Sequence, residues 1–296
     1  MSRSRRPGPS TRVRVHEVVA RPEPAVLRHE DRLATEEPLE IRLGWPGRPA
    51  QRVAVTMRTP GHDFELATGF LHGEGVLAAA DDLRTVAYCT DVTLSPEEEF
   101  NVVTVELDRP PRRAPAERYA GLSAASSACG VCGTESIEDV LALCAVPGGG
   151  PDGGPGDRWA GLRVSSEVLM GLPDRLRAEQ RVFDSTGGLH AAGLFDEAGA
   201  PSVVREDIGR HNAVDKVIGA RVLAGASPAA PLMCVSGRIG FEIVQKAVVA
   251  GVGVLAAVGA PSSLAVHLAA GAGLCTAGFV RDRRYVVYSA PERLGV

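Results

Sequence analysis

The chain has 296 residues, of which 45% are apolar and 23% are charged, and its formal net charge is −4. This composition is typical of a globular protein that is long enough for one large hydrophobic core or two domains. The negative net charge excludes an overall basic, nucleic-acid-binding composition, and we expect no nucleic-acid partner.

The placement of the chain in the cell follows from its cysteines and its apolar runs. Six cysteines scattered over this length are not a disulfide scaffold and suit a reducing compartment. Residues 1–14 contain five arginines and no apolar segment, which is unlike a signal peptide or an anchor. The longest apolar run, residues 247–260, is glycine-rich and shorter than the ~18 residues that a membrane span needs. We therefore expect a cytoplasmic protein with no membrane span.

The first part of the chain predicts a small α+β unit after a tail. Residues 1–14 are expected to be a disordered tail, because arginine, serine and proline offer nothing to bury. Residues 15–120 are predicted to form the N-terminal unit, on alternating apolar positions for strands and helically spaced ones for a helix. Its expected elements are a strand near 15–19, a hairpin of 39–43 and 51–57, a helix between 59 and 77, and strands near 83–89 and 101–107.

Residues 121–158 are predicted to be a cysteine-containing loop followed by a linker. A short helix is expected at 136–144, with Ser136 as a possible N-cap. The stretch after Val146 is rich in glycine and proline and has no apolar residue to anchor it, which is typical of a linker.

Residues 159–296 are predicted to form a larger C-terminal α/β unit. Strands alternate with helices there, which favours a largely parallel sheet with helices on its faces. The expected elements are helices at 165–180, 213–223, 241–250 and 262–270, a hairpin of 191–195 and 202–205, strands at 232–235, 252–258 and 285–288, and a polar turn at 183–190.

The most reactive stretch of the sequence is the pair Cys129 and Cys132. A glycine follows each cysteine, so the backbone can turn sharply and expose both thiols. A C-x-x-C pair also tends to lower the pKa of one cysteine, and the thiolate is the reactive form. Buried packing cysteines would prefer an apolar environment, which this segment of serine, alanine and glycine does not offer.

Four chemical interpretations of this pair compete. A structural zinc site needs four ligands, and no second pair stands nearby. A thioredoxin-like redox pair normally opens a helix after a strand, whereas residues 120–125 are a small-residue segment. A zinc deaminase would combine it with His72 and Glu74, but its signature places proline where Ala128 stands. An exposed thiol that carries a persulfide suits the glycine-flanked loop best.

A second candidate site lies in the C-terminal unit. Residues 236–238, Ser-Gly-Arg, are predicted to join a strand end to a helix start, where free N–H groups and an arginine suit a phosphate. An ordinary strand-to-helix turn is the alternative. The charged run at 281–284 is by itself a solvated turn or a phosphate site. Four further side chains could line the same opening or serve only the fold, namely His190, Asp207, Arg210 and His211.

Several blocks, in order, resemble one known family from about residue 30 to the C-terminus. They are residues 59–63 with 66–71 and 74–75, 126–133, 186–192, 205–216, 236–238 and 278–288. On these blocks the chain resembles the FdhD/NarQ family of formate dehydrogenase accessory sulfurtransferases. The glycine-rich linker at 147–157 is a departure from the family pattern.

The resemblance implies a specific activity. Such proteins take persulfide sulfur from a cysteine desulfurase and pass it to the molybdenum of the bis-molybdopterin guanine dinucleotide cofactor (Mo-bis-MGD), for formate dehydrogenase. It implies that Cys129 carries the persulfide, that Cys132 assists, and that no resident metal is held. It also implies a cytidine-deaminase-like C-terminal unit and a homodimer. The cofactor segment falls on Phe279, Val280, Arg281, Asp282, Arg283 and Arg284. A chaperone that inserts the cofactor without sulfur chemistry is the alternative.

Overall fold

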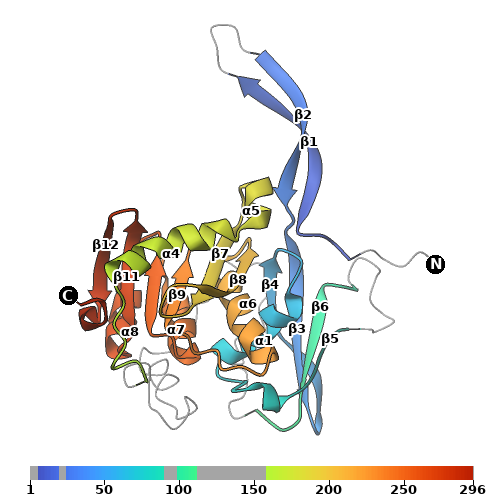
Figure 1. The fold of residues 1–296 in the computed structure, drawn as a ribbon. Coiled ribbons are helices and arrows are strands. Elements are labelled where there is room, and N and C mark those ends of the chain that lie inside the picture. Colours follow the sequence, from blue (N-terminus) through green and yellow to red (C-terminus); the bar gives the residue numbers. More distant parts are fainter. Residues whose placement is uncertain (1–5, 20–24, 90–98, 112–157, 296) are drawn as a thin grey trace.

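The computed structural model describes residues 6–19, 25–89, 99–111 and 158–295. The two cysteines of the C-x-x-C pair, the helix predicted at 136–144 and the linker lie outside the described residues. The described strands form sheets of six, four and two strands (Figure 1). In this part of the chain, no helix combines the length and apolarity of a membrane span.

The six-stranded sheet is mixed. Its neighbouring order is β12-β11-β10-β9-β7-β8. Only β9, β10 and β11 run parallel, whereas β7, β8 and β12 pair antiparallel to their neighbours. The expectation of a largely parallel sheet is therefore not confirmed, because a hairpin at each side adds antiparallel strands. The bounds are β7 (His190–Phe195), β8 (Pro201–Asp207), β9 (Leu232–Val235), β10 (Val254–Ala257), β11 (Cys275–Arg281) and β12 (Arg284–Ser289).

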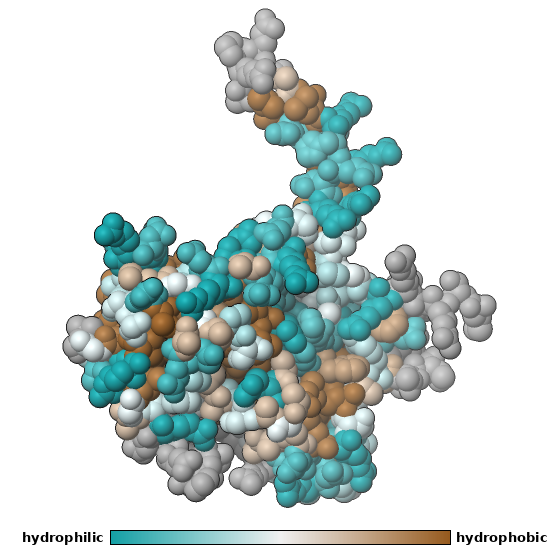
Figure 2. All heavy atoms as spheres, viewed as in Figure 1, coloured by the Kyte–Doolittle hydropathy of each residue, from teal (hydrophilic) through white to brown (hydrophobic). Residues whose placement is uncertain are grey.

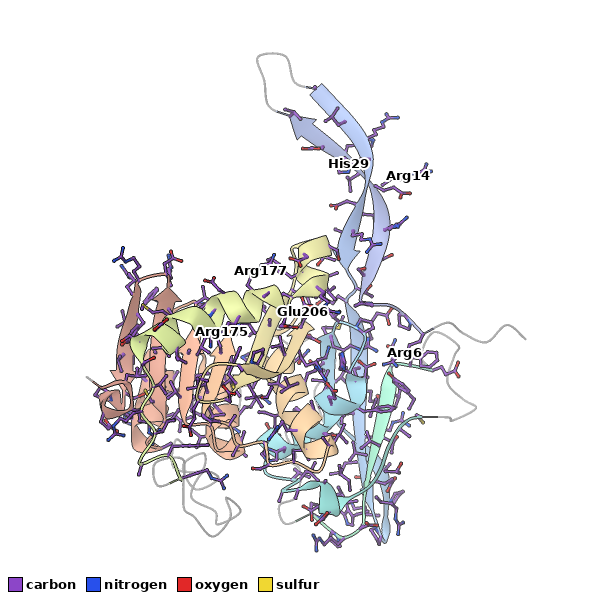
Figure 3. All side chains as sticks on the ribbon, in the orientation of Figure 1. Arg6, Arg14, His29, Arg175, Arg177 and Glu206 are labelled. Carbon is purple, nitrogen blue, oxygen red and sulfur yellow. The ribbon has the colours of Figure 1, made fainter. Side chains whose placement is uncertain are left out.

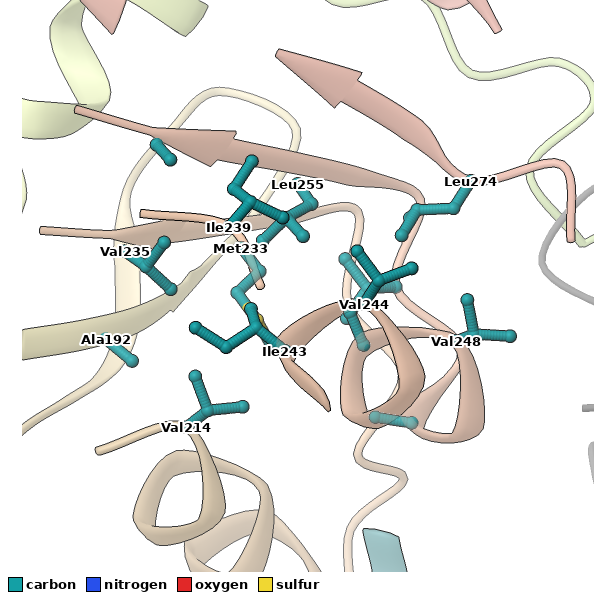
Figure 4. Close-up of a cluster of buried hydrophobic side chains, with 14 of the residues drawn as sticks. Ala192, Val214, Met233, Val235, Ile239, Ile243, Val244, Val248, Leu255 and Leu274 are labelled. Carbon is teal, nitrogen blue, oxygen red and sulfur yellow. The ribbon is translucent and has the colours of Figure 1, made fainter. Parts of the chain in front are cut away.

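Helices cover both faces of this sheet. Helix α4 packs on one face, where Leu169 and Leu172 join a buried apolar cluster with alternate strand residues. Helices α6, α7 and α8 pack on the other face, and Figure 4 shows Met233 and Leu255 of the strands meeting Val244 of α7. Both faces of the sheet are thus buried from water, which explains the nearly continuous apolar runs in β9 and β10. The helices are α4 (Ser166–Ala178), α5 (Arg181–Thr186), α6 (Arg210–Leu223), α7 (Phe241–Ala250) and α8 (Ser263–Gly271).

The four-stranded sheet joins this body mainly through helix α1 (Asp63–Gly73), with further hydrogen bonds from α6 to Met57 and Thr59. One side of α1 shares the third core cluster with the sheet, and the other side crosses α6. At the crossing a Cβ on Gly69 would lie 1.8 Å from the Asp215 carbonyl oxygen, so only glycine lets the helices approach this closely. The sheet order is β4-β3-β6-β5, with β3 (Glu37–Trp45), β4 (Arg48–Arg58), β5 (Leu83–Tyr88) and β6 (Val102–Leu107).

The third sheet is a hairpin that projects from the body (Figure 1). It consists of β1 (Ser10–Val19) and β2 (Ala25–Ala34), and we call it the arm. Residues 10–14 were expected to be disordered, but they form the first half of β1. Strand β2 was not predicted, because both faces of the arm are largely exposed and its apolar residues do not alternate as in a half-buried strand.

Most predicted elements are confirmed, with two further exceptions. The hairpin at 39–57, helix α1 and the strands and helices between 191 and 270 occur where the apolar spacing predicted them. The polar turn predicted at 183–190 begins instead with helix α5, Arg181–Thr186. Strand β11 was not predicted, because its small residues carry little strand signal.

Candidate functional site

The carboxyl ends of the three parallel strands form one continuous surface. Backbone N–H groups connect its parts: Gly259 donates to the Gly237 carbonyl oxygen at 3.1 Å, and Phe279 donates to the Gly259 carbonyl oxygen at 3.1 Å. In open α/β sheets ligands bind at this edge, beyond the carboxyl ends of the strands. We call this surface the ledge, and it consists of residues 236–238, 258–259 and 278–279.

Glycine is required where the ledge is tightest. A Cβ on Gly259 would lie 2.9 Å from the Gly237 carbonyl oxygen and 3.1 Å from Cα of Arg238. A Cβ on Gly278 would lie 3.0 Å from the Gly259 carbonyl oxygen. The loops therefore pack backbone against backbone, and the prediction that residues 236–238 lie between a strand end and a helix start is confirmed.

An open pocket of about 610 Å³ adjoins the ledge and shares Ser236 and Val258 with it. One wall of the pocket comes from the strand ends, with His190 at the start of β7 and Ile208 after β8. The other wall comes from α4, α5 and the loop between α5 and β7. Its lining is completed by Pro173, Asp174, Leu176, Arg177, Gln180, Phe183, Gly187, Gly188 and Leu189.

A carboxylate of the sheet holds helix α5, which forms part of the second wall of the pocket. Glu206 on β8 accepts hydrogen bonds from the backbone N–H groups of Val182 at 2.9 Å and Phe183 at 2.7 Å, in the first turn of α5. A carboxylate at a helix N-terminus satisfies otherwise unpaired N–H groups and opposes the positive end of the helix dipole. Figure 3 shows Glu206 and Arg177 on neighbouring elements of this region. Because α5 is short, this contact determines where Phe183 stands.

The pocket combines an aromatic ring with a few polar groups, as small-molecule sites do. The guanidinium of Arg177 lies 4.7 Å from the centroid of the Phe183 ring. Burial, and next the positive charge of Arg210, lowers the pKa of His190. A neutral imidazole there can both donate and accept a hydrogen bond. The Ser236 hydroxyl accepts from the Ala191 N–H at 2.9 Å and so joins β7 to the ledge.

The predicted cofactor segment lies at the same edge of the sheet. Phe279 takes a left-handed backbone conformation, with φ of 52°, inside an irregular stretch of the β11–β12 pairing. Val280 is buried, which anchors the segment. The other four predicted residues are exposed at the hairpin between β11 and β12, namely Arg281, Asp282, Arg283 and Arg284. The ledge therefore runs from the pocket toward three guanidinium groups.

The remaining sequence candidates separate into two groups. His190 and Arg210 come together at Gly237, since a Cβ there would lie 3.3 Å from Nδ1 of His190 and 3.7 Å from Cδ of Arg210. Asp207 is instead fully buried, and the backbone N–H groups of Thr59 and Gly209 donate to it. Asp207 thus holds the chain together and does not line the opening.

Two further candidates, His211 and His72, lie on helices α6 and α1. Nδ1 of His211 lies 3.1 Å from Oε2 of Glu242, and burial lowers the pKa of His211 to about 4. His72, of the deaminase alternative, is buried at the end of α1, and burial together with Lys246 lowers its pKa to about 4. Within the described residues, no three side chains of the metal-binding types come together.

Sequence reasoning missed the α4 and α5 side of the pocket. Phe183 and Gln180 were assigned to a polar turn and a helix end, without a role. The glycines at 187 and 188 were the available signal, because they open the loop that borders the pocket. The rest of this wall of the pocket depends on how α4 crosses the sheet, which local sequence does not encode.

A sequence model of the FdhD/NarQ family matches residues 34–295 of this chain. The chain belongs to the FdhD/NarQ family. The match spans the ledge, the pocket and the C-x-x-C pair, and it begins at the last residue of the arm.

Relatives in this family cover nearly the whole chain. A sulfur carrier protein FdhD of Streptomyces avermitilis is 46% identical over an alignment of 283 residues, which covers 92% of this chain and 92% of that protein. A protein of the same name from Nocardia farcinica is 46% identical over 287 residues, covering 96% of each. A crystal structure from Desulfotalea psychrophila, described as a candidate formate dehydrogenase accessory protein, superposes with a TM-score of 0.68 at 24% identity. It covers 96% of this chain and 99% of its own, and it shows that the fold is shared.

Proposed function

We propose that this FdhD/NarQ protein is a sulfur carrier that serves formate dehydrogenase. Cys129 takes a persulfide from a cysteine desulfurase, and the sulfur passes to the molybdenum of Mo-bis-MGD, bound as a substrate along the ledge. The observation that carries the proposal is the family match, with relatives at 46% identity that are named sulfur carriers. We further infer that the protein works as a cytoplasmic homodimer.

The chemistry needs both thiols. A desulfurase leaves Cys129 as a persulfide, Cys–S–SH, whose outer sulfur is the cargo. The Cys132 thiolate attacks the Sγ atom of Cys129, a Cys129–Cys132 disulfide forms, and the outer sulfur leaves as hydrosulfide toward the metal. The two cysteines lose two electrons, the released sulfur gains two, and a cellular dithiol then reduces the disulfide.

The ledge has the properties that a dinucleotide substrate requires. Arg238 stands on it, and the exposed guanidiniums of Arg281, Arg283 and Arg284 extend from its far end. Guanidinium groups bind phosphate oxygens in pairs, so they suit the charged linkage of such a molecule. The adjoining pocket of about 610 Å³ offers Phe183 as a ring on which a nucleobase can stack.

The test of the proposed function is sulfur loading. Wild-type protein incubated with a cysteine desulfurase and cysteine should gain the mass of one sulfur atom, and Cys129→Ala should not. Cys132→Ala should load but fail to release. Cys89→Ala is the matched control, because this half-buried cysteine is free and lies on another sheet edge.

Two results would contradict the proposal. Sulfur retained on Cys129→Ala would place the carrier elsewhere. Full activation of formate dehydrogenase by a variant without Cys129 and Cys132 would favour a chaperone that binds and inserts the cofactor without sulfur chemistry.

A further inference from the structure

The arm lacks the support that a two-stranded sheet normally needs. Strands β1 and β2 pair with each other over ten positions, from Ser10 opposite Ala34 to Val19 opposite Ala25. Neither strand pairs with another described strand. An isolated hairpin is at best marginally stable in water, because one face must be covered for independent stability. We therefore expect this ten-position hairpin to bind a partner that covers one of its faces.

One face of the arm is basic. Side chains of every second residue share a face, and directly paired residues lie side by side. Figure 3 shows Arg14 on this arm. The face that contains Arg14 holds four arginines and one histidine against a single carboxylate. Its members are Ser10, Arg12, Arg14, His16 and Val18 of β1 with Val26, Arg28, Glu30, Arg32 and Ala34 of β2.

The basic face does not serve the hairpin itself. Arg12 stands directly opposite Arg32, whereas Arg14 stands directly opposite Glu30. Like charges at directly opposed positions destabilise a strand pair. The neighbouring ion pair, Arg12 with Glu30 at 3.7 Å, is largely exposed and contributes little. A sequence that accepts this repulsion on an exposed face indicates a negatively charged partner.

The described residues nearest the end of the arm are apolar, and we call them the tip. Val18 is 64% exposed, Val26 is 59% exposed and Leu27 is 51% exposed. Figure 2 shows this apolar group next to the hydrophilic part of the arm. Four of the six exposed large apolar side chains among the described residues belong to the arm, so this surface is not a random scatter. Arginines around apolar anchors are typical of protein–protein interfaces.

The base of the arm borders the pocket. Strand β2 packs against α5, and a Cβ on Gly188, which lines the pocket, would lie 3.7 Å from Cβ of Ala34. A protein bound along the arm is thereby held beside the pocket mouth. The family model begins at residue 34, but the relative from Nocardia farcinica aligns over 96% of this chain, so that alignment includes residues of the arm.

We propose that the arm is the docking element for the enzyme that accepts the cofactor, and that it binds an acidic surface with an apolar recess. This inference rests on the proposed function for the identity of that enzyme. The described arm residues include no phenylalanine, tyrosine or tryptophan on which a base could stack, which disfavours single-stranded nucleic acid. The basic face provides charge steering, and the tip provides the apolar anchor.

The test measures binding of the full-length protein to the cofactor-free formate dehydrogenase of the same organism by biolayer interferometry. Reversing Arg12, Arg14 and Arg28 to Glu should weaken binding at least tenfold and reduce its dependence on salt. Val18→Ser with Val26→Ser should also weaken binding at least tenfold. The matched control reverses Arg48, Arg52 and Arg84, exposed on the four-stranded sheet, and should leave binding within twofold of wild type.

The other outcomes of this experiment each support or overturn the docking role of the arm. Unchanged binding by both arm variants, or equal losses in the arginine control, overturns the proposal. A lower oligomer mass by light scattering, with dehydrogenase binding unchanged, overturns it in favour of a second copy of this chain. Both arm variants should still load sulfur from the desulfurase. If wild-type protein fails to load sulfur while the arm variants lose binding, the sulfur chemistry is wrong and the docking role stands.

Discussion

The Nζ atom of Lys216 lies 2.6 Å from Oδ2 of Asp207, and both side chains are buried. Lys216 also donates to the Thr59 carbonyl oxygen at 2.9 Å. This pair joins three segments, namely the end of β8, helix α6 and the loop after β4. The loop belongs to the four-stranded sheet, whereas β8 and α6 belong to the larger body. The ion pair therefore fixes the two parts of the fold against each other.

We expect Lys216→Met to lower the free energy of unfolding by about 3–5 kcal/mol, because it leaves a buried carboxylate without its cation. Adding Asp207→Asn should restore part of the loss, since the amide oxygen still accepts from the Thr59 N–H. Urea denaturation followed by circular dichroism measures both. A cost below about 1 kcal/mol for the single variant would show that the remaining N–H donors suffice.

The close backbone packing of the ledge makes Gly259 sensitive to substitution. An added Cβ there meets backbone of the neighbouring loop at 2.9 Å, so the loop must move. We expect Gly259→Ala to cost about 1–3 kcal/mol in stability and to weaken nucleotide binding more than tenfold. Gly240→Ala is the matched control, because a Cβ at Gly240 meets nothing within 4 Å and its φ of −89° suits alanine. Equal binding by the two variants would show that the ledge is not part of the site.

The arginines beyond the ledge give a third prediction. Reversing Arg281 and Arg283 to Glu should weaken binding of a guanine nucleotide diphosphate at least tenfold, because two exposed cations become anions beside its phosphates. Calorimetry measures the affinity, and reversal of Arg48 and Arg52 supplies an equal change of net charge at a distant edge. If both double variants bind as the wild type does, the segment is only a solvated turn.

The sequence predicted elements whose apolar spacing reflects one buried face, and it failed where structure depends on distant contacts. Helix α1 and the hairpin of β3 and β4 were predicted because each buries one side. Helix α5 was missed because its six residues owe their cap to Glu206, 23 and 24 positions away. Strand β2 was missed because neither face of the arm is buried in the body.

In the candidate site, too, the parts set by local sequence were predicted and the parts set by distant contacts were not. The position of residues 236–238 at a strand end followed from local pattern, and so did their suitability for a phosphate. The neighbouring pocket did not, because it requires α4 to cross the sheet and α5 to be held by Glu206. Asp207 was a candidate for the opening, and only tertiary contacts show it to be a buried partner of Lys216.

The last prediction concerns stability at low pH. Burial, and next the charge of Lys246, lowers the pKa of His72 from 6.5 to about 4 in the folded protein. The unfolded chain binds a proton at this histidine below about pH 6.5, whereas the folded protein does not until about pH 4. The contribution of His72 is therefore fully present above pH 6.5 and is lost as the pH falls toward 4, by at most about 3 kcal/mol.

His72→Leu should flatten this part of the stability profile. The free energy of unfolding, measured in urea at several values between pH 7 and pH 4.5, should fall less steeply than in the wild type. His211, whose pKa is also about 4, acts in the same direction, and Asp215, whose pKa burial raises to about 6, acts in the opposite one. The difference between variant and wild type isolates His72 from both. Parallel profiles for wild type and His72→Leu would show that folding does not lower the pKa of His72.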